Sequence, residues 1–226
     1  MMSLLQHWFP QIDDWSELGQ ACLDTLTMLG GSLALTVAIG LPLGVWLFLS
    51  SPGQLKAQPA VYALLSLVIN ILRSVPFIIL MIVLMPVTYA LVGTKLGLRG
   101  AIPPLVIGAA PFFARLVETS LRDVNQGVIE ASQAMGATTW QIIHRVLLPE
   151  ARAGIWAGIT VTAIALVGYT AMGGTIGAGG LGDLAYRYGY LSYKSNYMLV
   201  TVVLLVILVQ ILQMLGDRIV AHFTRR

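Results

Sequence analysis

The feature that most constrains this chain is the length of its uncharged, apolar runs. No charged residue lies between Asp24 and Lys56, and Thr25–Leu49 within that interval is mostly apolar. A helix of about 20 mostly apolar residues is enough to cross the hydrocarbon core of a bilayer. Over the whole chain only 10% of residues are charged and the mean hydropathy is +0.83, whereas soluble domains carry about 25% charged residues. The chain is therefore expected to be an all-α, polytopic helical membrane protein.

A chain of 226 residues has room for about five or six membrane spans joined by short loops. We expect five transmembrane helices, at about 25–49, 67–89, 101–116, 154–172 and 198–214. They form a transmembrane domain of residues 21–215, with an N-terminal segment (1–20) outside the membrane and a cytoplasmic tail (216–226).

The second span is the least regular of the five. Residues 61–92 are apolar apart from Arg73, and they contain Pro76 and Pro86. At 1.5 Å per residue, a helix of this length would measure about 48 Å, against a hydrocarbon core of about 30 Å. The region therefore forms either one long broken helix or two cramped ones. Because no polar turn separates two halves, we expect one broken span.

Lysines and arginines in short loops orient the chain, since such residues accumulate on the cytoplasmic side. With the C-terminus inside and the N-terminus outside, eight basic residues are cytoplasmic and four are not. The eight are Lys56, Arg115, Arg122, Arg145, Arg152, Arg218, Arg225 and Arg226, and the four are Lys95, Arg99, Arg187 and Lys194. The sequence predicts this orientation, in which residues 126–149 are cytoplasmic.

Residues 126–149 are too polar for hydrocarbon, and their pattern predicts two short helices. Val128, Ala131 and Met135 form one apolar stripe, and Gly136 interrupts the helix. Thr138 and Gln141 fit a capping box that opens a second helix, whose apolar stripe is Trp140, Ile143 and Leu147 and which Pro149 is expected to end. Helices this short are marginal alone in water and need a surface to pack on. That surface is either the lipid headgroups or a partner protein.

The spacing within this segment resembles a signature of ABC importer permeases. That signature is E-A-A, three intervening residues, G, nine intervening residues, and I-x-L-P. This chain differs from it at two positions, with Ser132 for the second Ala and Val146 for Ile. The matching positions are Glu130, Ala131, Gly136, Val146, Leu148 and Pro149. The resemblance implies that these residues form coupling helices, which dock in a groove of a separate ATP-hydrolysing subunit. Residues 126–149 are therefore called the coupling segment.

Most of the chain, from about residue 18 to 220, is similar to the methionine-import permease subunits within that family. The matching stretches are LRSVPFIILM (72–81), GAAPFFARLVE (108–118), VGYTAMGGTIGAGGLGDLAYRYGY (167–190) and GDRIV (216–220). The resemblance implies a bacterial inner-membrane homodimer with two ATPase subunits, which carry ATP and Mg²⁺, and a lipoprotein that delivers D- or L-methionine from outside. It implies no cofactor on this chain.

Two features of the region after the fourth span invite a functional interpretation. GAGGLG (177–182) has the letters of a dinucleotide-binding motif, but that motif needs a strand before it and a helix after it. We expect an outward-facing turn instead. Met172, among small neighbours, is a candidate gate at a dimer axis or an ordinary core methionine, and Tyr169 is a candidate residue of the translocation path.

Three other classes of function were weighed. An ion-coupled secondary transporter usually needs acidic or polar groups near mid-bilayer, and the first, fourth and fifth spans carry no carboxylate there. No residues have metal-ligand or nucleophile–base spacing, so an enzyme is not expected. The net charge of +3 reflects loop arginines and not a nucleic-acid surface. The remaining alternative is an importer of the same family for another amino acid or small polar solute.

Overall fold

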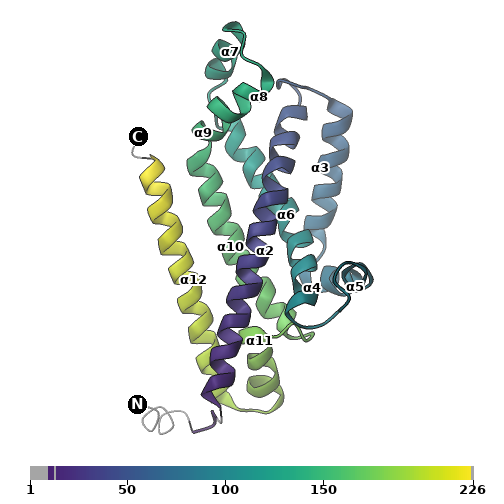
Figure 1. Cartoon of the computed structure of the whole chain (residues 1–226), viewed down its shortest axis with the longest axis vertical. Coiled ribbons are helices and arrows are strands. Elements are labelled where there is room, and N and C mark those ends of the chain that lie inside the picture. Colours follow the sequence, from purple (N-terminus) through teal and green to yellow (C-terminus); the bar gives the residue numbers. More distant parts are fainter. Residues whose placement is uncertain (1–9, 13, 225–226) are drawn as a thin grey trace. The chain divides into compact units, whose positions relative to one another are not determined.

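The computed structural model describes residues 10–12 and 14–224, and every regular element among them is a helix (Figure 1). The long helices are α2 (Trp15–Ser50), α6 (Gly97–Arg122), α10 (Arg152–Gly174) and α12 (Ser195–Thr224). The shorter α-helices are α3 (Pro59–Ser74), α4 (Phe77–Val83), α5 (Met85–Val92), α7 (Gln126–Ala134), α8 (Thr139–Ile142), α9 (Leu148–Glu150) and α11 (Gly180–Leu184). Two π-helices complete the fold, η1 (Ile143–Leu147) and η2 (Ala185–Leu191). The predicted all-α class is confirmed.

The four long helices are each long and apolar enough to cross a membrane, and a fifth span is present if the bent pair α3 and α4 counts as one. Each long helix contains one of the expected spans and extends beyond it at both ends. The exact membrane boundaries within these helices stay a prediction.

The region expected to form one broken span is divided into three helices. Helix α3 ends at Ser74, and Val75 is extended, with φ −79° and ψ 127°. A residue that precedes proline is driven out of the α conformation, and Pro76 itself has no N–H to donate. A second break falls at Leu84, just before Pro86 in the first turn of α5. Residues 67–89 are therefore not one continuous helix.

The chain forms two compact units, each assembled from three stretches of sequence. The first unit comprises Met1–Ala34, Pro76–Ile107 and Ala163–Leu212, and the second comprises Leu35–Val75, Gly108–Thr162 and Gln213–Arg226.

In the first unit, the start of α2 packs against α11. Leu18 and Ala21 of α2 and Leu181 and Leu184 of α11 form a buried cluster. The hydroxyl oxygen of Thr25 accepts a hydrogen bond of 2.9 Å from the backbone N–H of Leu181. This bond satisfies one of the N–H groups that the start of α11 would otherwise leave unpaired.

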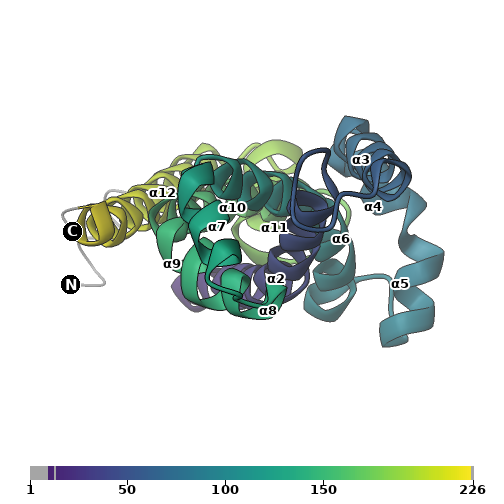
Figure 2. The ribbon, with the colours of Figure 1, turned by 90° about the horizontal axis from the view of Figure 1, so that it is seen from above.

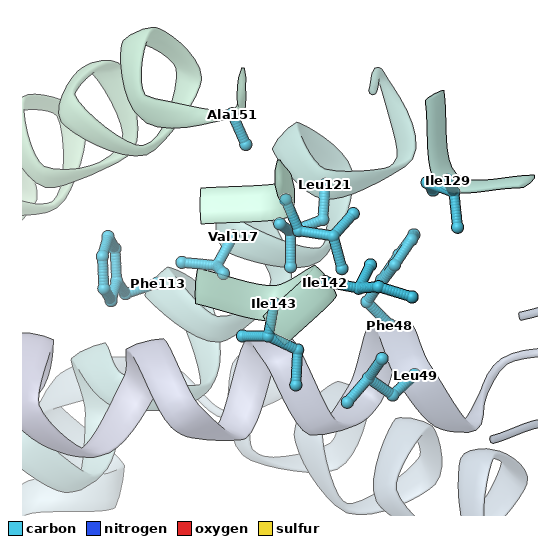
Figure 3. Packing of buried hydrophobic residues seen from close by; sticks show 10 residues of the cluster. Phe48, Leu49, Phe113, Val117, Leu121, Ile129, Ile142, Ile143 and Ala151 are labelled. Carbon is cyan, nitrogen blue, oxygen red and sulfur yellow. The ribbon is translucent and has the colours of Figure 1, made fainter. Parts of the chain in front are cut away.

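In the second unit, the ends of α2 and α6 carry the coupling segment. A buried cluster combines Phe48 and Leu49 of α2 with residues of α6, α7, α8 and η1 (Figure 3). Helices α2 and α6 approach closely because Gly44 has no side chain: a Cβ atom there would lie 2.5 Å from the backbone oxygen of Ala114. For each aliphatic side chain of this cluster that water would otherwise reach, full burial stabilises the fold by about 1.5–3 kcal/mol.

Candidate functional site

The first helix of the coupling segment, α7, has well-defined ends. The side-chain oxygen of Asn125 accepts from the N–H of Gly127 at 2.8 Å, which caps the start. At the other end Gly136 donates to Gln133 O at 2.9 Å and Ala137 donates to Ser132 O at 3.1 Å. This is a Schellman ending, which needs a left-handed residue, and Gly136 has φ +80°. The interruption predicted at Gly136 is therefore present.

The predicted capping box is confirmed at the start of α8. The backbone N–H of Gln141 donates to the Thr138 hydroxyl oxygen at 3.3 Å, and the backbone N–H of Thr138 donates to Gln141 Oε1 at 2.8 Å. These two bonds fix the direction in which the chain enters the second helix. Helices α7, α8 and α9 lie beside one another at one end of the second unit (Figures 1 and 2).

Pro149 does not end this helix, and the prediction that it would is wrong. The wider π-turn of η1 pairs the Leu148 N–H with Ile143 O, and Pro149 then occupies the first turn of α9, where no N–H is required. Ala151 donates to Leu147 O and Ile155 donates to Ala151 O, both at 2.9 Å. The second half of the coupling segment therefore joins α10 with only a slight break at Ala151.

The apolar stripe of α7 faces away from the rest of the second unit. Val128 and Met135 are 42% and 81% exposed, while the buried face of α7 is formed by Ile129 and Ser132. In the second helix Ile143 and Leu147 are buried as expected, but Trp140 is 67% exposed. Large apolar side chains that are this exposed on one helix face are typical of an interaction surface.

The six predicted coupling residues divide between that surface and the core beneath it. Glu130, Ala131, Gly136 and Pro149 are exposed. Val146 and Leu148 are half-buried and pack against the cluster that holds the segment to α2 and α6. A cleft of about 430 Å³ runs along the bend between the two helices, and Met135, Gly136 and Val146 line it. The arrangement offers a partner both a protruding helix face and a recess.

A charged cluster between α3 and α6 was not anticipated from the sequence. Glu118 on α6 has only 2% of its side chain exposed, and both Arg115 and Arg122 pair with it. The Tyr62 hydroxyl donates to Glu118 Oε1 at 3.2 Å, and Arg115 also donates to Ser66 Oγ at 2.8 Å on α3. The sequence does carry one sign of this cluster: Arg115 and Arg122 lie three residues before and four residues after Glu118, the spacings that bring side chains together on a helix. The cluster fixes α6, which leads directly into the coupling segment, against α3.

The two predicted gate residues lie in the first unit and differ in environment. Met172, near the end of α10, is half-exposed. Tyr169 is stacked on Phe77 of α4, with ring centroids 4.3 Å apart. The glycine-rich stretch that follows is a turn between α10 and α11, with positive φ at Gly177, Gly179 and Gly180. It follows a helix and not a strand, so the local fold excludes the dinucleotide interpretation.

Similarity to known proteins identifies the class to which this fold and segment belong. Residues 40–226 match the family of inner membrane components of binding-protein-dependent transport systems. The chain belongs to this family, whose members function in the inner membrane.

Individual relatives narrow the comparison further. The chain is 46% identical to the probable D-methionine transport system permease protein MetI of Vibrio cholerae, over 98% of both chains. It is 48% identical to the methionine import system permease protein MetP of Bacillus subtilis, over 99% of this chain and 100% of the relative. The resemblance found in the sequence is thereby confirmed.

Solved structures agree with this assignment. A chain from inward-facing conformations of the MetNI methionine ABC transporter superposes with a TM-score of 0.91 at 49% identity, covering 92% of this chain and 97% of the other. An amino acid ABC transporter described with histidines has a TM-score of 0.75 at 14% identity, over 98% and 97% of the two chains. The second likeness is one of fold alone.

Proposed function

We propose that this chain is the permease subunit of an ATP-binding-cassette importer that carries D- and L-methionine across the bacterial inner membrane. Two copies form the translocation path, and a substrate-binding lipoprotein delivers the amino acid from outside. Each coupling segment docks on one of two ATPase subunits, which bind ATP and Mg²⁺; this chain contributes no catalytic site and no cofactor. The observation that carries the docking role is the outward-facing apolar stripe of α7 beside Gly136. The substrate rests on the full-length similarity to methionine permeases.

The geometry of the second unit explains how docking could drive transport. The coupling segment shares one buried cluster with the ends of α2 and α6 and runs into the start of α10. The coupling segment is stiff for two reasons. Its core is closely packed, and backbone hydrogen bonds span the bend at Gly136 and the junction with α10 at Ala151. A displacement imposed by the ATPase on α7 is therefore transmitted to three long helices together.

Reconstitution tests the proposal. The chain is coexpressed with its ATPase and lipoprotein, purified as a complex and placed in vesicles, and uptake of labelled L- and D-methionine is measured with and without ATP. We expect ATP-dependent methionine uptake that excess histidine or glutamine does not compete away. ATP-driven uptake of a different amino acid would favour the related-importer alternative, and uptake by the permease without the ATPase would favour a secondary transporter.

The proposed orientation places the coupling segment in the cytoplasm and the loop before α12 outside. In a Cys22→Ser background, Gln141→Cys reports on the coupling segment and Tyr193→Cys, at an exposed position, reports on the outer loop. A membrane-impermeant thiol reagent added to intact cells should label position 193 and not position 141. Permeabilised cells, in which both should react, are the control. Labelling at 141 in intact cells would invert the topology and remove the basis for docking.

Met172 is proposed as an apolar gate of the translocation path, with Tyr169 in the path wall. Methionine is flexible and repacks easily, so two copies meeting across a dimer axis could close and reopen without breaking polar contacts. Met172→Ala should lower the number of substrate molecules moved per ATP hydrolysed in vesicles, because the path would leak. Met214→Ala, which truncates a similarly exposed methionine of α12 outside the coupling segment, is the matched control. An unchanged ratio with a lower melting temperature would make Met172 a packing residue.

A further inference from the structure

The second unit contains another cavity besides the cleft at the bend of the coupling segment, and the two share no lining residue. It has a volume of about 450 Å³ and lies between the last turns of α2 and the second half of the coupling segment. Val45 and Leu49 form one wall, and Ile143 and Leu148 form the other. Lys56 and His144 also line it, and none of the lining residues is an aspartate or glutamate.

The cavity continues an exposed apolar stripe of α2. Leu35, Ile39 and Trp46 are each about half exposed, and with Pro42 they recur at helical spacing along one face of a helix long and apolar enough to span a membrane. Pro42 and Trp46 also line the cavity. An acyl chain lying along this stripe would therefore enter the cavity without crossing polar surface.

The other end of the cavity has the composition of a membrane–water interface. Trp46 and Trp140 line it and are largely exposed, and the Trp140 ring lies over the His144 ring with centroids 3.8 Å apart. Ser50, Lys56 and Gln58, beyond the last apolar turn of α2, supply the polar end. Tryptophan and lysine gather at this depth in membrane proteins, where rings meet the headgroups and ammonium groups meet phosphate.

We propose that this cavity binds a membrane phospholipid with an anionic headgroup, its acyl chain against Val45 and Leu49 and its phosphate at Lys56. The lining is apolar at one end and cationic at the other, which matches an amphiphile with a negative head. An interface with a second copy of the chain would not require a lining that is apolar at one end and cationic at the other. Because Ile143, His144 and Leu148 belong to the coupling segment, the bound lipid contacts the element proposed to receive motion from the ATPase.

Native mass spectrometry of the full-length permease tests this site. The protein is exchanged into detergent with equal amounts of phosphatidylglycerol and phosphatidylcholine, and the retained lipids are counted. The wild type should prefer phosphatidylglycerol, and Lys56→Gln should reduce that preference about fivefold, the contribution typical of one basic residue at an anionic lipid surface. Lys95→Gln, which removes the same charge in the first unit, should leave the preference unchanged. Equal effects of the two substitutions, or no preference in the wild type, would overturn the proposal.

A second measurement separates the lipid from other occupants. In a Cys22→Ser background, His144→Cys is treated with a short bifunctional thiol cross-linker in native membranes. The proposal expects no cross-linked dimer through position 144, since lipid fills the cavity. A dimer formed in high yield would show that a second copy covers this face, and would overturn the assignment. Val45→Phe, which narrows the apolar end, should reduce retention of both lipids, whereas retention at the wild-type level would contradict the acyl-chain placement.

Discussion

Replacing Gly136 by leucine should abolish methionine uptake and release the ATPase while leaving membrane insertion intact. Gly136 has φ +80°, a left-handed conformation that costs a residue with a side chain about 1–2 kcal/mol. Among the residues that the structure describes, apart from the two neighbours of Gly136 in the chain, none has an atom within 4 Å of where a Cβ atom would be. The leucine therefore strains the bend between α7 and α8, and its side chain projects into the proposed docking surface. We expect uptake to fall by more than tenfold, measured as labelled methionine accumulated per milligram of permease.

Two companion variants distinguish backbone strain from blocked docking. Gly136→Asn should retain much of the activity, because asparagine tolerates the left-handed conformation better than other residues with side chains. Ala134→Leu, at an exposed position of α7 without positive φ, controls for bulk alone elsewhere on the segment. Retention of the ATPase is read from copurification. Wild-type transport and ATPase retention by Gly136→Leu would show that docking does not pass through this bend.

The sequence predicted the coupling segment in considerable detail because its signals are local. A capping box needs only two suitable residues three positions apart, here Thr138 and Gln141. A helix that ends with one residue in the left-handed conformation needs only a glycine at that position, here Gly136. The continuation through Pro149 was not predictable in the same way. It depends on the π-turn of η1, which widens the helix just before the proline, and no simple residue pattern marks such a turn.

Periodicity also did not predict whether the apolar stripe of α7 would be buried or exposed. Spacing placed Val128, Ala131 and Met135 on one stripe, but periodicity does not say whether a stripe faces the core of its own chain or a partner. The structure buries Ile129 and Ser132 and leaves that stripe exposed. The Glu118 cluster was missed for a related reason. Its partners Tyr62 and Ser66 come from α3, and only tertiary packing brings them to α6.

Substitution of Glu118 should produce the largest loss of stability in the second unit. Removing one member of a buried ion pair leaves an uncompensated charge, which typically costs 3–5 kcal/mol. Here the remaining charges are guanidinium groups on side chains that are 21% and 42% exposed, so water can solvate them in part. We therefore expect Glu118→Ala to lower the free energy of unfolding by about 3 kcal/mol, at the lower end of that range. For a chain of this size, that corresponds to a fall of roughly 6–12 °C in melting temperature in detergent.

A double-mutant cycle identifies the source of that loss. Tyr62→Phe removes a neutral donor to Glu118 and an acceptor for Arg122, and should cost about 1 kcal/mol. If the unpaired charge dominates, adding Arg115→Gln to Glu118→Gln should recover part of the stability lost in the single Glu118→Gln variant. Additive losses in the double variant would mean that Arg115 acts mainly through Ser66 and Asn70 on α3, to which it also donates. A Glu118→Ala melting temperature equal to that of the wild type would show that the cluster does not hold α6 against α3, and that the stiffness of the segment beyond α6 comes from its apolar core alone.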